Sequence, residues 1–334
     1  MGLSRVRVNE FMNDARGRHA LSPTDVPAEG WKDIASRVKE EIADDNTSLA
    51  SAGVSFFGFL ALIPGLAATI SIYAMFADPT EIQRQLSEWL GNLPEEAQAL
   101  MSDQLSRLAR QTTGALTWST VVAVALALWT ASSGMANLIK AINMAYDEED
   151  QRNFLVRRGL ALLLSLGAIV LLIAIAFAVT AVFPWLSELT GSALAAGLGQ
   201  VLAWILAGAA FAFALAALYR VAPHRNDPEW KWATVGSIVA VILWLGATVL
   251  FRIYVANFGT YNETYGSLAA VVILLFWLYI TSFVVLLGAQ INAESEHQTR
   301  ADTTVGRDKP MGQRDAEMAD TLGRARAEDP DRHQ

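Results

Sequence analysis

The chain contains no cysteine among its 334 residues, and charged residues make up only 17% of it. The lack of cysteine excludes a disulfide framework, a thiolate metal site and a cysteine nucleophile. Soluble domains carry charge on roughly a quarter of their residues, so the shortage of charge indicates that much of the chain is not solvated by water. A net charge of −8, with no basic cluster away from the helix-flanking segments, argues against nucleic acid as a partner.

Histidine is equally scarce, and the four residues at positions 19, 224, 297 and 333 have no spacing typical of a metal site. The sequence has no Gly-x-Ser-x-Gly elbow, no phosphate-binding glycine loop and no dinucleotide fingerprint. Its apolar stretches contain neither paired aspartates nor a serine with a histidine, as proteolysis within a bilayer would need. We therefore expect a protein that is not an enzyme, with no catalytic residues, no metal and no cofactor.

Long apolar runs, by contrast, are abundant, and 53% of the residues are hydrophobic. Crossing a hydrocarbon core of about 30 Å takes roughly 20 apolar residues as a helix. Six stretches meet that length: Leu49 to Ala77, Leu116 to Met135, Gly159 to Leu186, Leu194 to Tyr219, Trp232 to Val255, and Ser267 to Ile291. The fold class predicted is an all-α polytopic membrane protein with six transmembrane helices.

Lysine and arginine are distributed unevenly among the connections between these stretches. Both terminal segments, the second connection and the fourth connection hold 21 of the 25 lysine and arginine residues, whereas the third and fifth connections, around Glu188 and Asn257 to Gly266, have none. Because basic loops stay on the cytoplasmic side during insertion, the pattern predicts cytoplasmic N and C termini in a bacterial inner membrane.

Segments outside the spans divide the chain into three parts. Residues 1–45 form a cytoplasmic N-terminal segment in which Trp31, Ile34, Val38 and Ile42 recur at helical spacing, over about residues 29–43. This stripe predicts an interfacial amphipathic helix on an anionic leaflet, and packing against cytoplasmic loops is the alternative. Residues 46–293 form the membrane domain. Residues 294–334 mix both charge signs with few aromatic or β-branched residues, so we expect a disordered cytoplasmic tail.

The first external connection, from Asp78 to Ala115, is too long for a structureless loop. Two amphipathic patterns lie within it, and Pro94 opens the second. They predict an external helical hairpin between the first and second spans, which packs on the outer helix ends.

Small and weakly polar residues line parts of the spans. Ser51 and Ser55 share a face of the first helix, and Pro64 interrupts its middle, where proline bends a helix. Thr281, Gly288 and Asn292 form a similar stripe on the sixth. Such residues allow close helix packing in membranes, and a polar translocation path is the alternative interpretation.

Arg252 is the one full charge embedded within a predicted span, near its external end. A helix-end anchor that extends to the interface is one interpretation. The other is a site for an anionic headgroup, together with nearby Tyr261 and Tyr265.

Taken together, these segments resemble the YihY/BrkB family of bacterial inner-membrane proteins, once labelled ribonuclease BN. The resemblance runs from about Trp31 to Ala293. It includes Leu128 to Gly134 with Thr130 and Ser132, then Ala141 to Tyr146 with Asn143, and the final run Leu287 to Ala293. The family usually has glutamate where this chain has Gln290. The resemblance implies a multi-pass inner-membrane protein with transport or lipid movement as its suggested role.

Our leading functional hypothesis is a transporter or flippase-like protein for a lipidic or amphipathic substrate, with membrane lipids as its partners and with oligomers possible. A non-catalytic scaffold for envelope machinery is the alternative. The candidate substrate path comprises Ser51, Ser55, Pro64, Thr130, Ser132, Asn143, Arg252, Tyr261, Tyr265, Thr281, Gly288, Gln290 and Asn292.

Overall fold

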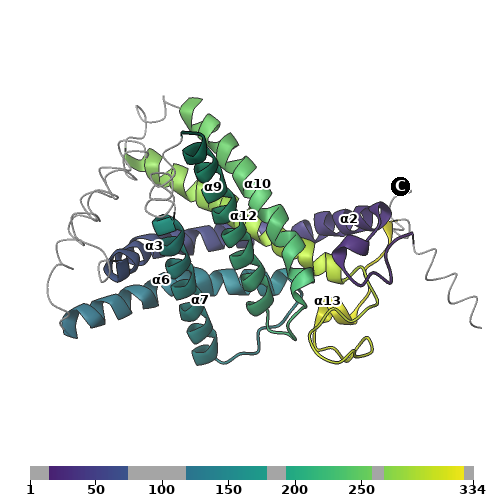
Figure 1. The fold of residues 1–334 in the computed structure, drawn as a ribbon. Coiled ribbons are helices and arrows are strands. Elements are labelled where there is room, and N and C mark those ends of the chain that lie inside the picture. The colour runs from purple at the N-terminus through teal and green to yellow at the C-terminus, as the bar shows by residue number, and fades with distance from the viewer. Residues whose placement is uncertain (1–14, 74–117, 179–192, 258–266, 327–334) are drawn as a thin grey trace, which may run out of the picture.

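The structure is a computed structural model, which describes residues 15–73, 118–178, 193–257 and 267–326 (Figure 1). In these residues the fold is all-helical, without a strand; one isolated bridge joins Pro228 to Thr304. The elements are η1 (Pro23–Asp25), α2 (Ala28–Asp44), α3 (Thr47–Tyr73), α6 (Trp118–Ala145), α7 (Phe154–Phe177), α9 (Ala193–Val221), α10 (Trp230–Asn257), α12 (Ser267–Glu296) and α13 (Glu317–Asp320). The predicted external hairpin, from Asp78 to Ala115, lies outside the described residues.

A long helix occupies the described part of each of the six apolar stretches. Within the described residues, four segments are long and apolar enough to cross a membrane: Phe154–Phe177, Val201–Val221, Trp230–Val255 and Val271–Glu296. Thr47–Leu62 is a shorter apolar helical segment. These helices support the prediction of a multi-pass membrane protein.

The long helices form two diverging pairs (Figure 1). Helix α3 packs along α6, and we call this pair the first arm; α9 packs along α10, and we call this pair the second arm. Helix α12 packs against both α10 and α3 and so joins the arms, while α7 crosses α6. Away from α12 the two arms point in different directions, so the molecule has a V shape in this view.

Local polar groups set the ends of several helices. The side chain of Asn153 caps α7 by accepting a hydrogen bond from the backbone N–H of Val156, 2.9 Å away. After α6, Asp147 has a φ of 52°, and the backbone N–H of Glu148 returns to the carbonyl of Asn143. Asn46, with a φ of 49°, makes the corner between α2 and α3. Aspartate and asparagine tolerate this left-handed conformation better than most residues.

Buried side chains gather where α6 and α9 end, where α10 begins, and around the last turns of α12. We call this end of the molecule the base. Its core includes Ile139, Ile142 and Tyr146 from α6 and the residue that follows it, with Tyr219 from α9 and Leu286 from α12. All five are nearly or completely buried. Because the connections 146–153 and 222–229 and both terminal segments meet here, the base holds segments from the whole length of the chain.

The amphipathic helix predicted before the first span is present as α2, but protein covers its apolar stripe. Ile34 and Val38 are 2% and 7% exposed, and they pack with Leu287 and Ile291 of α12. The structure therefore corrects the interfacial assignment and favours the packed alternative, with α12 itself as the partner. The fold uses this stripe to attach the N-terminal segment to the last helix.

The tail expected to be disordered is instead folded over residues 297–326. Arg314 is 3% exposed and donates to four backbone carbonyls, those of Arg300, Ala301, Lys309 and Ala319, at 2.6 to 3.0 Å. Asp320 accepts from the backbone N–H groups of Gly312 and Arg314. Ordering of this segment depends on side-chain to backbone hydrogen bonds, which a count of aromatic and β-branched residues does not detect.

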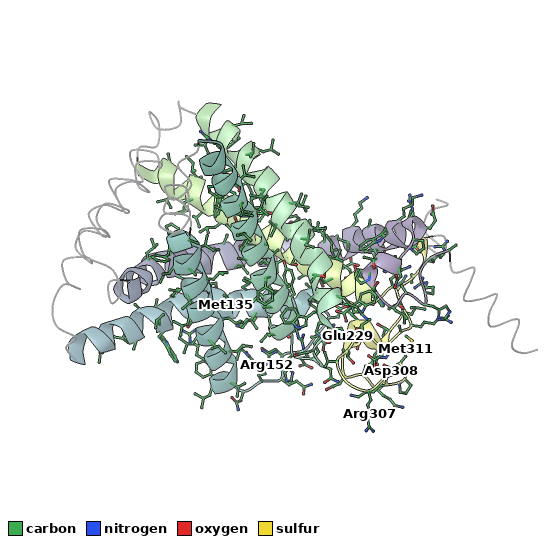
Figure 2. All side chains as sticks on the ribbon, viewed as in Figure 1. Met135, Arg152, Glu229, Arg307, Asp308 and Met311 are labelled. Carbon is green, nitrogen blue, oxygen red and sulfur yellow. The ribbon has the colours of Figure 1, made fainter. Side chains whose placement is uncertain are left out.

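The tail also attaches to three other segments of the base. The backbone N–H of Arg300 donates to the carbonyl of Arg18, and that of Asn226 donates to the carbonyl of Asp315. The backbone N–H of Glu317 donates to the carboxylate of Glu148 at 2.9 Å. In Figure 2, Arg307, Asp308 and Met311 lie on the outer loop of the tail, and Glu229 lies closer to the bundle.

Candidate functional site

Three carboxylates from separate segments converge at the base. Glu41 lies in the last turn of α2, Asp45 follows that helix, and Asp147 follows α6. Their carboxylate oxygens lie within 4.8 Å of one another. Glu41 and Asp45 are half-buried and Asp147 is exposed. Three carboxylates at this spacing can share protons or offer hard oxygen ligands to a divalent cation.

Burial and mutual repulsion raise the pKa values of this acidic cluster. Burial, with the charges of Glu294 and Asp147 next in effect, raises the pKa of Glu41 to about 7. The pKa of Asp45 is raised to about 6, first by burial and then by Asp147. That of Asp147 is raised mainly by burial. At neutral pH the cluster is therefore expected to hold part of its protons, since close carboxylates resist joint ionisation.

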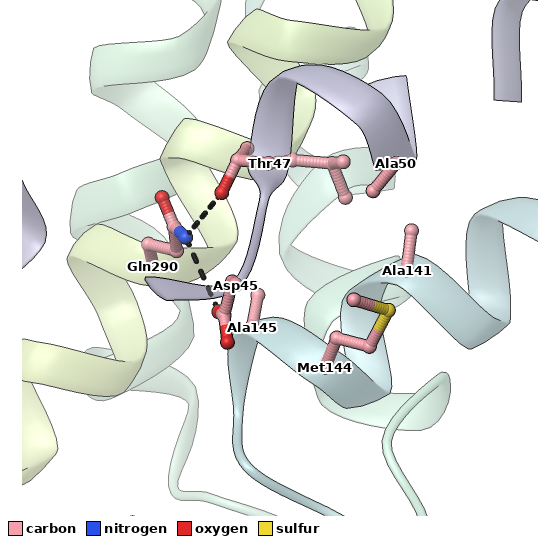
Figure 3. A pocket seen from close by; sticks show the side chains of 8 residues that line it. Asp45, Thr47, Ala50, Ala141, Met144, Ala145 and Gln290 are labelled. Carbon is pink, nitrogen blue, oxygen red and sulfur yellow. Dashed lines mark hydrogen bonds between the residues drawn. The ribbon is translucent and has the colours of Figure 1, made fainter. Parts of the chain in front are cut away.

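Gln290 links the acidic cluster to α12. Its Nε2 donates to Thr47 Oγ1 at 2.8 Å and lies 3.4 Å from Asp45 Oδ2, as the dashed lines of Figure 3 show. These residues line one wall of a small cavity of about 10 Å³, and Ala141 and Met144 of α6 line the opposite wall (Figure 3). A cavity of that size has room for about one water molecule.

Two buried ion pairs hold the end of α12 to other segments. Arg37 of α2 contacts Glu294 through Nε, and its Nη1 donates to the carbonyl of Arg324 at 2.9 Å. Arg225 pairs with Glu296 at 2.5 Å, with both side chains 0% exposed, and its guanidinium lies over the ring of Tyr146. Loss of one partner would leave a buried charge uncompensated, so each pair fixes the base strongly.

Four of the predicted path residues bond within their own helices. Ser51 Oγ donates to the carbonyl of Thr47 at 2.7 Å, and Ser55 Oγ donates to that of Ala52 at 2.8 Å. The remaining two, on α6, do the same: Thr130 Oγ1 donates to the carbonyl of Leu126 and Ser132 Oγ to that of Trp129. Ser51, Ser55 and Ser132 are buried, and Thr130 is exposed.

Asn143 and Asn292 bond between helices or connections. Asn143 Oδ1 accepts from the backbone N–H of His224 at 2.9 Å, and its Nδ2 donates to the carbonyl of Ile139 at 2.8 Å. Asn292 Oδ1 accepts from the backbone N–H of Gly236 at 2.6 Å, and its Nδ2 donates to the carbonyl of Ala233 at 3.0 Å. Asn143 therefore ties the end of α6 to the connection after α9, and Asn292 ties the end of α12 to the start of α10.

Gly288 and Thr281 mark the contact of α12 with α10. A Cβ on Gly288 would lie 2.5 Å from Tyr219 Oη and 2.8 Å from Ala240 Cβ, so only glycine fits this crossing. Thr281 Oγ1 accepts from the indole N–H of Trp244 at 3.2 Å. These contacts give the stripe on the sixth stretch a packing role, and its use as a path stays a prediction.

Two further candidates, Pro64 and Arg252, lie apart from the base. Pro64 is half-buried within α3, which continues to Tyr73. Arg252 is exposed near the C-terminal end of α10. Tyr261 and Tyr265 lie outside the described residues. The structure thus brings Gln290, Asn143 and Asn292 together at the base and leaves Arg252 separate.

Sequence reasoning overlooked the acidic cluster. Glu41 and Asp45 are four residues apart, but Asp147 is about 100 residues away, and only the packing of α3 on α6 brings it near. Metal sites are recognisable in a sequence by short spacings between ligands such as histidine and cysteine, which carboxylates from distant segments do not reproduce. The one available signal was the acidic run from Asp147 to Asp150 at the end of an apolar helix.

The sequence profile of the family described as "Virulence factor BrkB" matches residues 38–312. The match covers most of the chain, including all six long helices. The chain belongs to the BrkB family. The acidic cluster of this BrkB protein and the pair of Arg225 with Glu296 lie inside the matched region. Glu294 lies inside it as well, and its partner Arg37 lies one residue before it.

Individual relatives agree with this membership. "Putative ribonuclease-like protein YfkH" of Bacillus subtilis is 27% identical over 251 residues, which cover 73% of this chain and 88% of that protein. A UPF0761 membrane protein of Idiomarina loihiensis is 25% identical, covering 75% of this chain and 87% of its own. One of Rhodospirillum centenum is 29% identical, covering 75% and 54%. No solved structure matches the chain.

Proposed function

We propose that this BrkB protein moves a lipidic or amphipathic substrate across the bacterial inner membrane without catalysing a reaction. The observation that supports this most is the divergence of the two arms from a single packed base (Figure 1). A pair of helix bundles joined at one end can rock about that end, as bundles do in alternating access.

The chemistry of the arms suits a substrate with apolar chains. Phe56 and Leu60 on the first arm are 51% and 52% exposed, and Ile205 and Leu245 on the second arm are 61% and 52% exposed. Lipid can therefore reach both arms. A substrate that arrives from the bilayer would not need to leave an apolar environment until its polar group meets the protein.

The base has the properties expected of a fixed point for such motion. Its core and its two buried ion pairs join α2, α12 and the connection after α9. Moving the far ends of the arms relative to each other therefore costs less free energy than opening the base. The acidic cluster at the same end offers groups that exchange protons near neutral pH. Coupling of movement to protons or cations is consistent with this placement.

The test is a lipid-movement assay in reconstituted vesicles. Fluorescent phospholipid is placed in one leaflet and its arrival in the other is followed by chemical quenching, with protein-free vesicles as the control. Folded protein should speed the exchange above the protein-free rate. If protein that is verified as folded moves neither lipids nor small amphipathic solutes, the proposal fails.

A second measurement reports on the arms directly. Because the chain lacks cysteine, spin labels can be attached at Leu60→Cys and Leu245→Cys alone, one on each arm. The distance distribution between the labels should change when transported lipid is added. Labels placed at Glu149→Cys and Arg307→Cys, both at the base, provide the control pair and should not move.

The folded tail favours a scaffold as the second candidate function. Val305 and Met311 on the tail are 51% and 36% exposed, which gives protein partners an ordered docking surface. Crosslinking in membranes distinguishes the two. A scaffold should crosslink to one stable protein partner. Substitution of Val305 and Met311 should remove that crosslink and leave any lipid movement unchanged.

A further inference from the structure

Arg158 occupies an unusual place among the basic residues of this protein. It lies in the second turn of α7, and its Nη2 donates to the carbonyl of Trp129, well inside α6. Nη2 also lies 3.4 Å from Ser133 Oγ. The guanidinium carbon lies 4.4 Å from the centroid of the Trp129 ring, so the charged plane is held against an aromatic face.

Among the described residues, no carboxylate pairs with Arg158, in contrast to its neighbours. Arg152 and Arg157 both pair with Asp150, at 3.6 and 3.0 Å. In the described part of the chain, the partners of Arg158 are a carbonyl, a hydroxyl and a ring, all uncharged. Its Nε is enclosed and has no hydrogen-bond acceptor there. A cation in apolar surroundings is costly without a counter-ion.

The surroundings of Arg158 are apolar and open. Phe154 and Leu155, on the preceding turn of α7, are 66% and 76% exposed. On α6, Leu126 and Trp129 are 62% and 45% exposed. A Cβ added at Gly159, the next residue, would meet no atom within 4 Å. An acyl chain can therefore lie along this surface beside the guanidinium.

We propose that Arg158 binds the phosphate of an anionic phospholipid whose acyl chains lie against the exposed side chains of α6 and α7. The planar guanidinium, with its orientation fixed by Trp129, suits the oxygens of a phosphate. The lipid supplies the missing negative charge, and its chains match the apolar neighbours. This binding goes beyond the proposed function, because a lipid can occupy the site whether or not the protein moves it.

Native mass spectrometry with mixed lipids tests the proposal. The full-length protein is titrated with phosphatidylglycerol and phosphatidylcholine of the same chain length. The wild type should bind its first phosphatidylglycerol molecule about tenfold more tightly than its first phosphatidylcholine molecule. Inorganic phosphate and glycerol phosphate are added in separate arms. If either displaces the lipid at equal concentration, the site recognises a free phosphate compound and the lipid assignment is wrong.

Arg220→Gln provides a matched control for Arg158→Gln. Arg220 also lies over a tryptophan, 4.7 Å from the Trp230 ring centroid, but it has a carboxylate partner, Asp227, at 3.4 Å. Arg158→Gln should abolish the preference for phosphatidylglycerol, and Arg220→Gln should retain it. Equal preference in both variants, or equal loss in both, would overturn the proposal.

Arg158→Lys keeps the test decisive if Arg158→Gln does not fold. Lysine retains the charge but not the forked donors, so the preference should fall by a few fold and remain above one. A wild type that binds both lipids equally well contradicts the proposal without any variant.

Discussion

At the scale of single residues, the contact between α10 and α12 depends on the absence of a side chain. Tyr219 Oη donates to the carbonyl of Val285 at 2.7 Å and lies where a Cβ on Gly288 would project. One methyl group would therefore displace a buried hydrogen bond as well as Ala240. Sequence reasoning identified the small residue but could not identify the tyrosine that fills the space beside it.

Gly288→Ala is expected to lower stability by about 1–3 kcal/mol, because it overpacks this crossing. Thermal unfolding in detergent, followed by loss of helical signal, measures the change. Gly246→Ala is the control, since a Cβ at Gly246 in α10 meets no atom within 4 Å. Equal effects of the two substitutions would mean that the close approach of α10 and α12 is not tight in solution.

The raised pKa of Glu41 predicts a pH-dependent stability. The folded protein holds the Glu41 proton up to about pH 7, whereas the unfolded chain releases it near 4.5. Between these values the folded state binds more protons, so stability falls as pH rises through this window. Glu41→Gln removes the effect and should stabilise the protein at pH 8 by about 1 kcal/mol, after allowance for solvent screening.

Unfolding midpoints of the wild type and Glu41→Gln, measured from pH 4 to pH 8, test this. The difference between the two should grow with pH and level off above about pH 7. Glu40→Gln, at the exposed neighbouring position, controls for the loss of one charge. A difference that is constant across the range would show that the acidic cluster does not retain protons.

At the scale of elements, apolar length and charge placement were enough to locate the long helices. The predicted stretches Leu194 to Tyr219 and Trp232 to Val255 agree closely with α9 and α10. Helix α6, however, extends ten residues beyond Met135, because Ile139 and Ile142 continue its buried face into the base. Partners decide such ends, and a hydropathy pattern does not contain the partners.

The same limitation explains the errors in the terminal segments. The stripe of α2 has the pattern of a helix on lipid, and it packs on α12 because Arg37 and Glu294 fix that contact. The tail lacks an apolar core of its own, and hydrogen bonds to Arg18, Asn226 and Glu148 help to order it. Neither the contact of α2 with α12 nor that of the tail with the base can be recognised from the local sequence. The acidic cluster went unpredicted for this reason as well.

Arg314→Ala should release the tail without unfolding the bundle. Its guanidinium satisfies four backbone carbonyls, so its loss should lower the free energy of local opening by on the order of 3 kcal/mol. Amide hydrogen exchange over residues 300–320 should accelerate, while exchange in α10 stays slow. Arg307→Ala, on the exposed outer loop (Figure 2), is the control and should leave exchange unchanged.

At the scale of the whole molecule, the base predicts that both terminal segments and two connections lie on one side of the membrane. Leu21, Glu149 and Arg307 are exposed there on three different segments. In the cysteine-free chain, cysteines at these positions should all react with an impermeant reagent from the cytoplasmic side only. A cysteine at Glu188, which the charge pattern places on the opposite side, should react from outside.

Reaction of the cysteines at Glu149 and Arg307 from opposite sides would be incompatible with the contact between Glu317 and Glu148. It would also refute an even number of crossings between those segments. Equal labelling from both sides would indicate mixed orientation, and the basic connections would then not set the topology.

The late position of the tail has a consequence for biosynthesis. Arg37 leaves the ribosome well before its partner Glu294, which is 257 residues later, and before the carbonyl of Arg324, which is 287 residues later. Until α12 has been synthesised, the apolar stripe of α2 has no partner helix to cover it, and the nearest apolar material is the membrane surface beside the growing chain. Closure of the base therefore waits for α12, and a product that terminates before this helix would keep the stripe uncovered for quality-control proteases to recognise.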